Sequence, residues 1–154
     1  MAEQQTEQRR LSIQRIYIRD LSFELPAAPD IFRQEWQPDI ELNLRVEVNP
    51  LSAQQAEVVI IAEVAAKQAD QVVFLIEVQQ AGLFTMTGFS QEEQQPLLHI
   101  GAANTLFPYV REAISDLVTR GSLPPLILQP VNFEALYQQR LAQDTSEADT
   151  SDST

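Results

Sequence analysis

A proline-rich break between two helical segments constrains the fold of this chain more than any other feature. Before the break, apolar residues recur at helical spacing and polar residues occupy the opposite side of the same helix. The apolar set is Leu106, Val110, Ala113, Ile114, Leu117 and Val118, and the polar set is Arg111, Glu112, Ser115 and Asp116. Gly121 is expected to end this helix in a left-handed conformation, and Pro124 and Pro125 prevent its continuation. Asn132 then predicts the N-cap of a second helix.

Four segments before this break have the composition of β-strands, and the second alternates most clearly. There, Ile40, Leu42, Leu44, Val46 and Val48 share one face, whereas Glu41, Asn43, Arg45 and Glu47 share the other. We expect strands at residues 12–24, 40–48, 56–66 and 72–85, an irregular crossover at 26–38 and a polar loop at 90–96. Short connections between the last three strands favour antiparallel pairing. Four strands followed by two helices indicate an α+β fold.

The fourth predicted strand is apolar on both faces near its start. Val72 and Phe74 lie on one side, and Val73 and Leu75 lie on the other. Such a strand usually lies in the middle of a sheet with both faces covered. Because the sequence offers only two helices, an uncovered apolar face would have to meet another chain.

Composition limits the classes of partner. The formal net charge is −12, which disfavours binding to nucleic acid or to an anionic membrane and attracts basic partners, although solubility alone also explains it. The sequence has no cysteine and no apolar run as long as a membrane span, and residues 1–10 lack the apolar centre of a signal peptide. We therefore expect a cytoplasmic protein with one domain at residues 11–143, a flexible segment at 1–10 and a disordered acidic tail at 144–154.

The residues give little support to an enzyme. His99 is the one histidine, and its apolar neighbours are typical of a structural histidine. No set of Cys and His residues could form a zinc site, and no glycine-rich phosphate loop occurs. We expect no catalytic residues, no metal and no cofactor.

Four blocks of sequence resemble the SecB family, the cytosolic chaperones of bacterial protein export. The first three are IQRIYIRDLSFE at Ile13–Glu24, QEWQPDIELNL at Gln34–Leu44 and FLIEVQQAGLF at Phe74–Phe84. The fourth is LFPYVRE…VTRG…LPPL…PVNF-x-AL, which begins at Leu106. Their order and number make the resemblance far more specific than any single motif.

The resemblance implies a four-stranded antiparallel sheet with two helices packed on one face. It also implies an ATP-independent holdase that binds unfolded precursor proteins and delivers them to the SecA motor. The alternative, from a different class, is an acidic α+β adaptor or assembly protein that binds one folded partner. Suppression of aggregation of several unrelated proteins distinguishes the two.

Two binding surfaces follow from the resemblance. In SecB an acidic patch on the outer face of the sheet recruits the basic zinc-bearing tail of SecA, and the matching residues are Asp20, Glu24, Leu75 and Glu77. Unfolded chains are held in grooves between the second helix, the crossover and the sheet. The corresponding groove residues are Trp36, Ile40, Leu42, Leu44, Phe133, Leu136, Tyr137 and Leu141. The alternative role for each of them is packing in the core.

The resemblance also implies a homotetramer built as a dimer of dimers. The first strand is expected at a sheet edge, where an apolar strand pairs with a symmetry mate or aggregates. The predicted interface residues are Ile16, Tyr17 and Ile18 on this strand, with Arg111 and Ser115 on the polar face of the first helix.

Overall fold

The computed structural model of the chain describes residues 8–151. Most of the segment expected to be flexible, residues 1–7, lies outside the described residues. Arg10 belongs to the first strand, so the boundary predicted at residue 11 was one residue late.

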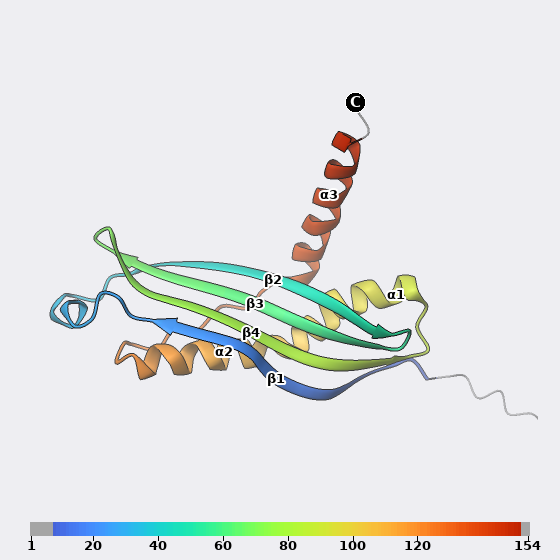
Figure 1. The fold of residues 1–154 in the computed structure, drawn as a ribbon, viewed down its shortest axis with the longest axis horizontal. Helices are drawn as coiled ribbons and strands as arrows, with labels where there is room; N and C mark the ends of the chain where they lie inside the picture. The colour runs from blue at the N-terminus through green and yellow to red at the C-terminus, as the bar shows by residue number, and fades with distance from the viewer. Residues whose placement is uncertain (1–7, 152–154) are drawn as a thin grey trace, which may run out of the picture.

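The four predicted strands form one antiparallel sheet (Figure 1). The strands are β1 (Arg10–Glu24), β2 (Asp39–Ser52), β3 (Gln55–Gln68) and β4 (Gln71–Thr87), in the spatial order β1-β4-β3-β2. Short hairpins join β2 to β3 and β3 to β4, as the sequence predicted. Because β1 and β2 occupy opposite edges, the crossover between them passes the end of the sheet and contains a short 3-10 helix, η1 (Asp30–Arg33).

A continuous helical segment follows the sheet, and its first part was not predicted. It comprises α1 (Gln91–Pro96), the π-helix η2 (Leu97–Ala102) and α2 (Ala103–Arg120). The polar loop predicted at residues 90–96 is therefore wrong. Ser90 and Glu93 form a reciprocal capping box, in which each side chain accepts the backbone N–H of the other residue. The sequence signal was this Ser-x-x-Glu spacing.

The core lies between α2 and one face of the sheet, here called the inner face (Figure 1). Alternate residues of β3 and the apolar stripe of α2 are fully buried together; they include Val58, Ile60, Val64, Leu106, Val110 and Ile114. Gly82 on β4 permits this close approach, since a Cβ at this position would lie 2.9 Å from Leu106 Cδ2. The amphipathic helix predicted from residues 106–118 is thus confirmed.

The end of α2 differs in detail from the prediction. Gly121 follows the helix as expected, but its φ is −79°, and the left-handed residue is Ser122, with φ +61°. A Cβ at Gly121 would lie 2.8 Å from the ring of Phe23. Glycine is therefore needed here for close packing against β1, not for a left-handed backbone.

The last helix, α3 (Phe133–Ser151), begins as predicted and continues farther. The Asn132 side-chain oxygen accepts the backbone N–H of Ala135 at 3.0 Å and caps the helix. The disordered tail predicted from residue 144 is wrong as far as Ser151, and residues 152–154 lie outside the described residues. Hydroxyl groups in this part, such as that of Thr145, donate to backbone carbonyls of the preceding turn. Figure 1 shows α3 projecting away from the sheet, so the inner face is covered mainly by α2 together with η2, which adds Leu98 and Ala102 to the core.

Candidate binding surfaces

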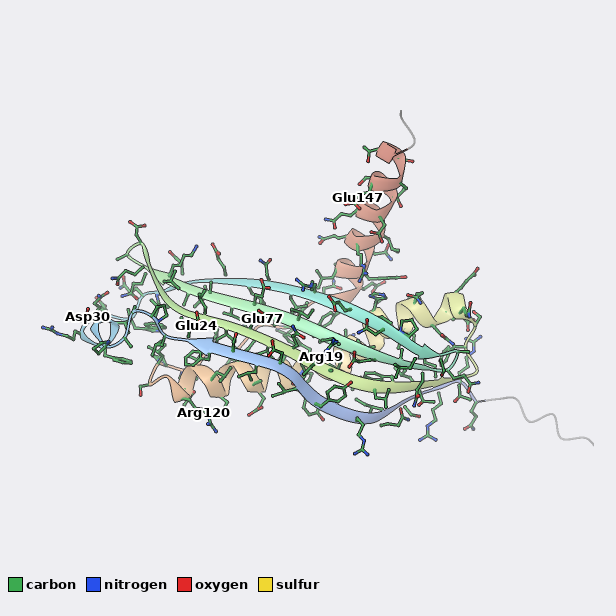
Figure 2. All side chains as sticks on the ribbon, in the orientation of Figure 1. Arg19, Glu24, Asp30, Glu77, Arg120 and Glu147 are labelled. Carbon is green, nitrogen blue, oxygen red and sulfur yellow. The ribbon has the colours of Figure 1, made fainter. Side chains whose placement is uncertain are left out.

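The strand register places the four predicted SecA-binding residues on the outer face of the sheet, opposite α2. Ser22 pairs with Glu77, and Glu24 pairs with Leu75, across β1 and β4. Asp20 lies opposite Gln79, one pair farther along the same face. Figure 2 shows Glu24 and Glu77 on these neighbouring strands. The sheet therefore gathers side chains that are more than fifty positions apart in the sequence.

Two further carboxylates that the sequence did not single out extend this surface. Glu63 on β3 lies directly opposite Glu77, and Ala65 separates Leu75 from Glu41 on β2. An open depression of about 340 Å³ lies over these strands, and its lining includes Ser22, Glu24, Glu41, Glu63, Leu75 and Glu77. We call these residues, with Asp20, the outer acidic patch. The available signal was Glu63 itself, a single charge within the apolar segment VVIIAEVAA.

Most charges of the outer acidic patch have no cationic partner in the part of the chain that the structure describes. Within residues 8–151, no cation lies within 4.0 Å of the carboxylates of Asp20, Glu24, Glu63 and Glu77. Glu41 alone is paired, with Lys67 at 4.0 Å. Leu75 is 40% exposed among these carboxylates. Such a surface can attract a Lys/Arg-rich peptide and offer it one apolar contact.

Farther along the outer face, Glu57 is held in a separate polar network. It accepts hydrogen bonds from the Tyr17 hydroxyl at 2.5 Å, Asn49 Nδ2 at 2.9 Å and Arg19 Nη1 at 3.1 Å. The hydrogen bond from Tyr17 is the largest influence and lowers the pKa of Glu57. Burial, followed by this hydrogen bond, raises the pKa of Tyr17 to about 12. Glu57 is therefore part of a network that joins three strands and is not part of the outer acidic patch.

A second hollow, of about 600 Å³, lies between β2 and α3. Four of the eight predicted groove residues line it, namely Leu44, Phe133, Leu136 and Tyr137. Val46, His99 and Arg140 also line it, although the sequence did not assign them to the groove. We call this hollow the β2–α3 groove.

The other four predicted groove residues lie elsewhere. Ile40 and Leu42 are exposed on β2 beyond the groove, Leu141 is exposed on α3, and Trp36 packs half-buried against the core. Phe133 lines the groove but is only 2% exposed, with its ring edge-on to Phe107 at 5.7 Å between centroids. Phe133 therefore packs mainly in the core, whereas the sequence left open whether it lies in the core or is exposed in the groove.

Among the polar residues of the β2–α3 groove, His99 and Arg140 make defined contacts with its other lining residues. The His99 ring stacks on Tyr137 with 4.9 Å between centroids. Burial, and then the nearby Arg140 charge, lowers the pKa of His99, which favours a neutral aromatic surface. Arg140 Nη1 donates to the backbone carbonyl of Val46 at 2.8 Å.

The predicted interface residues fall on different surfaces. Ile16 and Ile18 lie on the inner face of β1 and are 36% and 50% exposed, whereas Tyr17 points to the outer face and bonds Glu57. Ser115 and Arg111 border a depression of about 410 Å³ on α2. The Arg111 side chain is also used within the chain, since Nε donates to the Leu128 carbonyl at 3.1 Å.

Comparisons with known proteins decide the family. The family model described as preprotein translocase subunit SecB matches residues 4–144. The chain belongs to the SecB family. The protein-export protein SecB of Stutzerimonas stutzeri is 47% identical over 142 residues, which cover 92% of this chain and 87% of the relative. The SecB of Pseudomonas syringae pv. tomato is 50% identical over 130 residues, covering 84% and 79%.

A solved structure agrees with this assignment. The SecB-like chaperone of Mycobacterium tuberculosis, in complex with a ChAD peptide from the HigA1 antitoxin, matches with a TM-score of 0.62 and 26% identity. The match covers 79% of this chain and 91% of that one. SecB membership makes this chain a chaperone of protein export and confirms the predicted α+β fold. None of the helices within residues 8–151 is long and apolar enough to span a membrane.

Proposed function

We propose that this SecB-family chain holds unfolded precursor proteins in the β2–α3 groove without using ATP. The observation that carries the proposal is a groove beside a strand edge in which the apolar and aromatic side chains of Leu44, Leu136 and Tyr137 lie among polar side chains. Surfaces of this kind accept many apolar segments. A protein that binds only unfolded chains holds them by mass action, so nucleotide hydrolysis is not required.

Aggregation assays test this function. Several unrelated proteins are diluted from denaturant, and light scattering is followed with and without the SecB-family chain. The expected result is suppression for all of them at equal molar ratios, with no change when ATP is added. Suppression restricted to one protein, together with tight binding to its folded form, would favour the adaptor alternative.

The outer acidic patch is the proposed docking site for SecA. Its four unpaired carboxylates and exposed Leu75 suit the basic tail that the family implies for SecA. Because the patch extends over the outer face of β1, β4 and β3 whereas the β2–α3 groove lies at the β2 edge beside α3, a client and SecA can bind at the same time.

A homotetramer is the proposed assembly. The inner face of β1 carries Ile13, Ile16, Ile18 and Leu21, all between 36% and 50% exposed, at an edge that α2 leaves uncovered. A second copy related by a two-fold axis would cover this apolar strip and end the open edge. The depression beside Arg111 and Ser115 is the proposed contact between dimers.

A further inference from the structure

The free edge of β2 has a defined set of unpaired backbone groups. In an antiparallel ladder, alternate residues direct both N–H and C=O to the neighbouring strand, and the others direct them away. The register between β2 and β3 is regular from Asp39 to Pro50. Pro50 has no N–H and is tolerated only where its nitrogen faces away from the ladder. Leu42, Leu44 and Val46 have the same parity as Pro50, so their backbone groups face the free edge.

The contact made by Arg140 supports this assignment independently. Its guanidinium approaches from α3 and donates to the carbonyl of Val46, one of the groups assigned to the free edge. The side chains of Leu44 and Val46 point into the β2–α3 groove. One segment therefore offers both main-chain hydrogen-bonding groups and apolar side chains, and Arg140 occupies one of those groups.

Arg140 is also a cation without a carboxylate partner among the described residues. Within residues 8–151, the ion pairs include none for Arg140. Charged side chains at an exposed edge protect it from pairing with other strands. Arg140 is such a charged side chain, because its guanidinium is hydrogen-bonded to an edge carbonyl and is not engaged by a carboxylate of the described residues, although the net charge of the chain is −12.

We propose that Arg140 is a specificity-determining residue that blocks strand pairing at the free edge of β2. An extended segment of an unfolded polypeptide displaces Arg140 from this edge when it binds. The segment pairs with Leu42, Leu44 and Val46 as an added strand, and its own N–H replaces the guanidinium at the Val46 carbonyl. The inference rests on the proposed function of the groove. Because the incoming strand must displace Arg140, segments that cannot pair through their backbone are disfavoured.

The test compares Arg140→Met, which removes the donor but keeps an aliphatic stem, with wild type. Gln139→Met is the matched control, since Gln139 also lines the groove and this variant adds apolar surface without freeing the edge. The probe is a short apolar peptide labelled with a fluorophore. Two further versions of the peptide carry N-methyl groups on alternate backbone nitrogens, at the odd-numbered residues in one version and at the even-numbered residues in the other. Binding is measured by fluorescence anisotropy, and folding is verified by circular dichroism.

Arg140→Met should bind the unmodified peptide about 2- to 10-fold more tightly, which corresponds to one net hydrogen bond. Gln139→Met measures the effect of added apolar surface alone, so any gain in affinity that it gives should be smaller and the same for all three peptides. N-methylation on one parity should remove the gain of Arg140→Met. Three outcomes would overturn the proposed role of Arg140. They are equal affinity of Arg140→Met and wild type, an equal gain in Gln139→Met, and a gain that N-methylation does not change. Self-association of Arg140→Met without tighter peptide binding would also overturn it, because the occupant would then be a second copy. A wild type that binds no peptide would instead count against the proposed function.

Discussion

Glu77 on β4 lies directly opposite Glu63 on β3, on the outer face of the sheet. Directly opposed residues on antiparallel strands have Cβ atoms roughly 4.5–5.5 Å apart, and like charges there are destabilising. Neither carboxylate has a cation within 4.0 Å in the part of the chain that the structure describes. A basic partner would relieve this repulsion, which is a physical reason for the outer acidic patch to bind one.

Replacing Glu63 should therefore stabilise the protein and at the same time weaken its binding of a basic partner. We expect Glu63→Gln to raise the free energy of unfolding by about 0.2–1 kcal/mol, because it removes the repulsion from Glu77. The same change should weaken binding of the SecA tail. Urea unfolding at fixed protein concentration and low salt measures the first effect, and calorimetry measures the second. Glu35→Gln, on the exposed crossover, is the control; equal effects of the two variants would contradict the prediction.

Charge reversal should abolish SecA binding while leaving client holding intact. The variant is Asp20→Lys, Glu24→Lys and Glu77→Lys combined, and its matched control carries the same reversal at Glu35, Glu92 and Glu147. Figure 2 shows Glu147 on α3, away from Glu24 and Glu77. Wild-type binding should also weaken as salt rises, since exposed charges are screened beyond about 8–10 Å at physiological ionic strength. Wild-type affinity in the first variant would eliminate this surface as the docking site.

Polar substitution in the β2–α3 groove should weaken client binding without unfolding the protein. We expect Leu44→Ser with Leu136→Ser to lower the affinity for unfolded clients roughly tenfold, because both half-buried side chains line the groove. Leu51→Ser, on the β2–β3 hairpin, is the matched control, and aggregation suppression is the measurement. Unchanged suppression by the folded double variant would place the clients elsewhere.

The core role of Phe133 gives a contrasting prediction. Phe133→Ala should lower the free energy of unfolding by about 3–5 kcal/mol, because it leaves a cavity beside Phe107. Urea denaturation measures this loss. A loss below 1 kcal/mol combined with weaker client binding would instead show that Phe133 belongs to the client surface.

The network around Glu57 predicts a dependence of stability on pH. Because its pKa is lowered in the folded state, Glu57 contributes stability above its ordinary pKa of 4.5, and this contribution is lost as pH falls through the lowered pKa. Tyr17→Phe removes the largest cause of that shift. The difference in unfolding free energy between wild type and Tyr17→Phe should therefore be constant from pH 6 to 8 and shrink below about 4.5. A difference that does not change with pH would contradict this account.

Tyr17 predicts a second change at alkaline pH. Its raised pKa means that the stabilisation is complete below its ordinary pKa of 10.0 and is lost as pH rises through about 12. Absorbance titration of the tyrosinates should show one group ionising near pH 12. Glu57→Gln should lower this midpoint only in part, since burial is the larger cause. Titration of all three tyrosines near 10 would refute the network.

Dilution should dissociate the proposed tetramer into dimers before monomers. The apolar strip on the inner face of β1 predicts a stronger contact than the depression on α2, whose lining includes the charged residues Arg111, Glu112 and Asp116. Light scattering across a dilution series measures the masses, and Ile18→Asp should yield smaller species than Ser115→Asp at equal concentration. A folded wild-type monomer at micromolar concentration would defeat this assembly.

Local patterns predicted the elements of the fold correctly where the responsible interactions are themselves local. The alternation of Ile40 to Val48, the helical stripe of α2 and the cap at Asn132 all involve residues within a few positions of one another. The prediction of disorder from Asp144 is wrong as far as Ser151, because a polar composition does not by itself exclude a helix. Instead α3 continues to Ser151, and the hydroxyls of Thr145, Ser146 and Thr150 donate to backbone carbonyls of the preceding turn.

The sequence alone determined the family, the strand faces and the core stripe of α2, because periodicity and block order are properties of the linear chain. Tertiary structure decided which carboxylates meet and which apolar residues remain open. Register is a long-range property, and a slip by one residue would move Glu63 and Glu77 to the other face. The contact of Arg140 with Val46 joins residues 94 positions apart. It exists because strand order leaves β2 at an edge and α3, capped by Asn132, brings Arg140 to that edge.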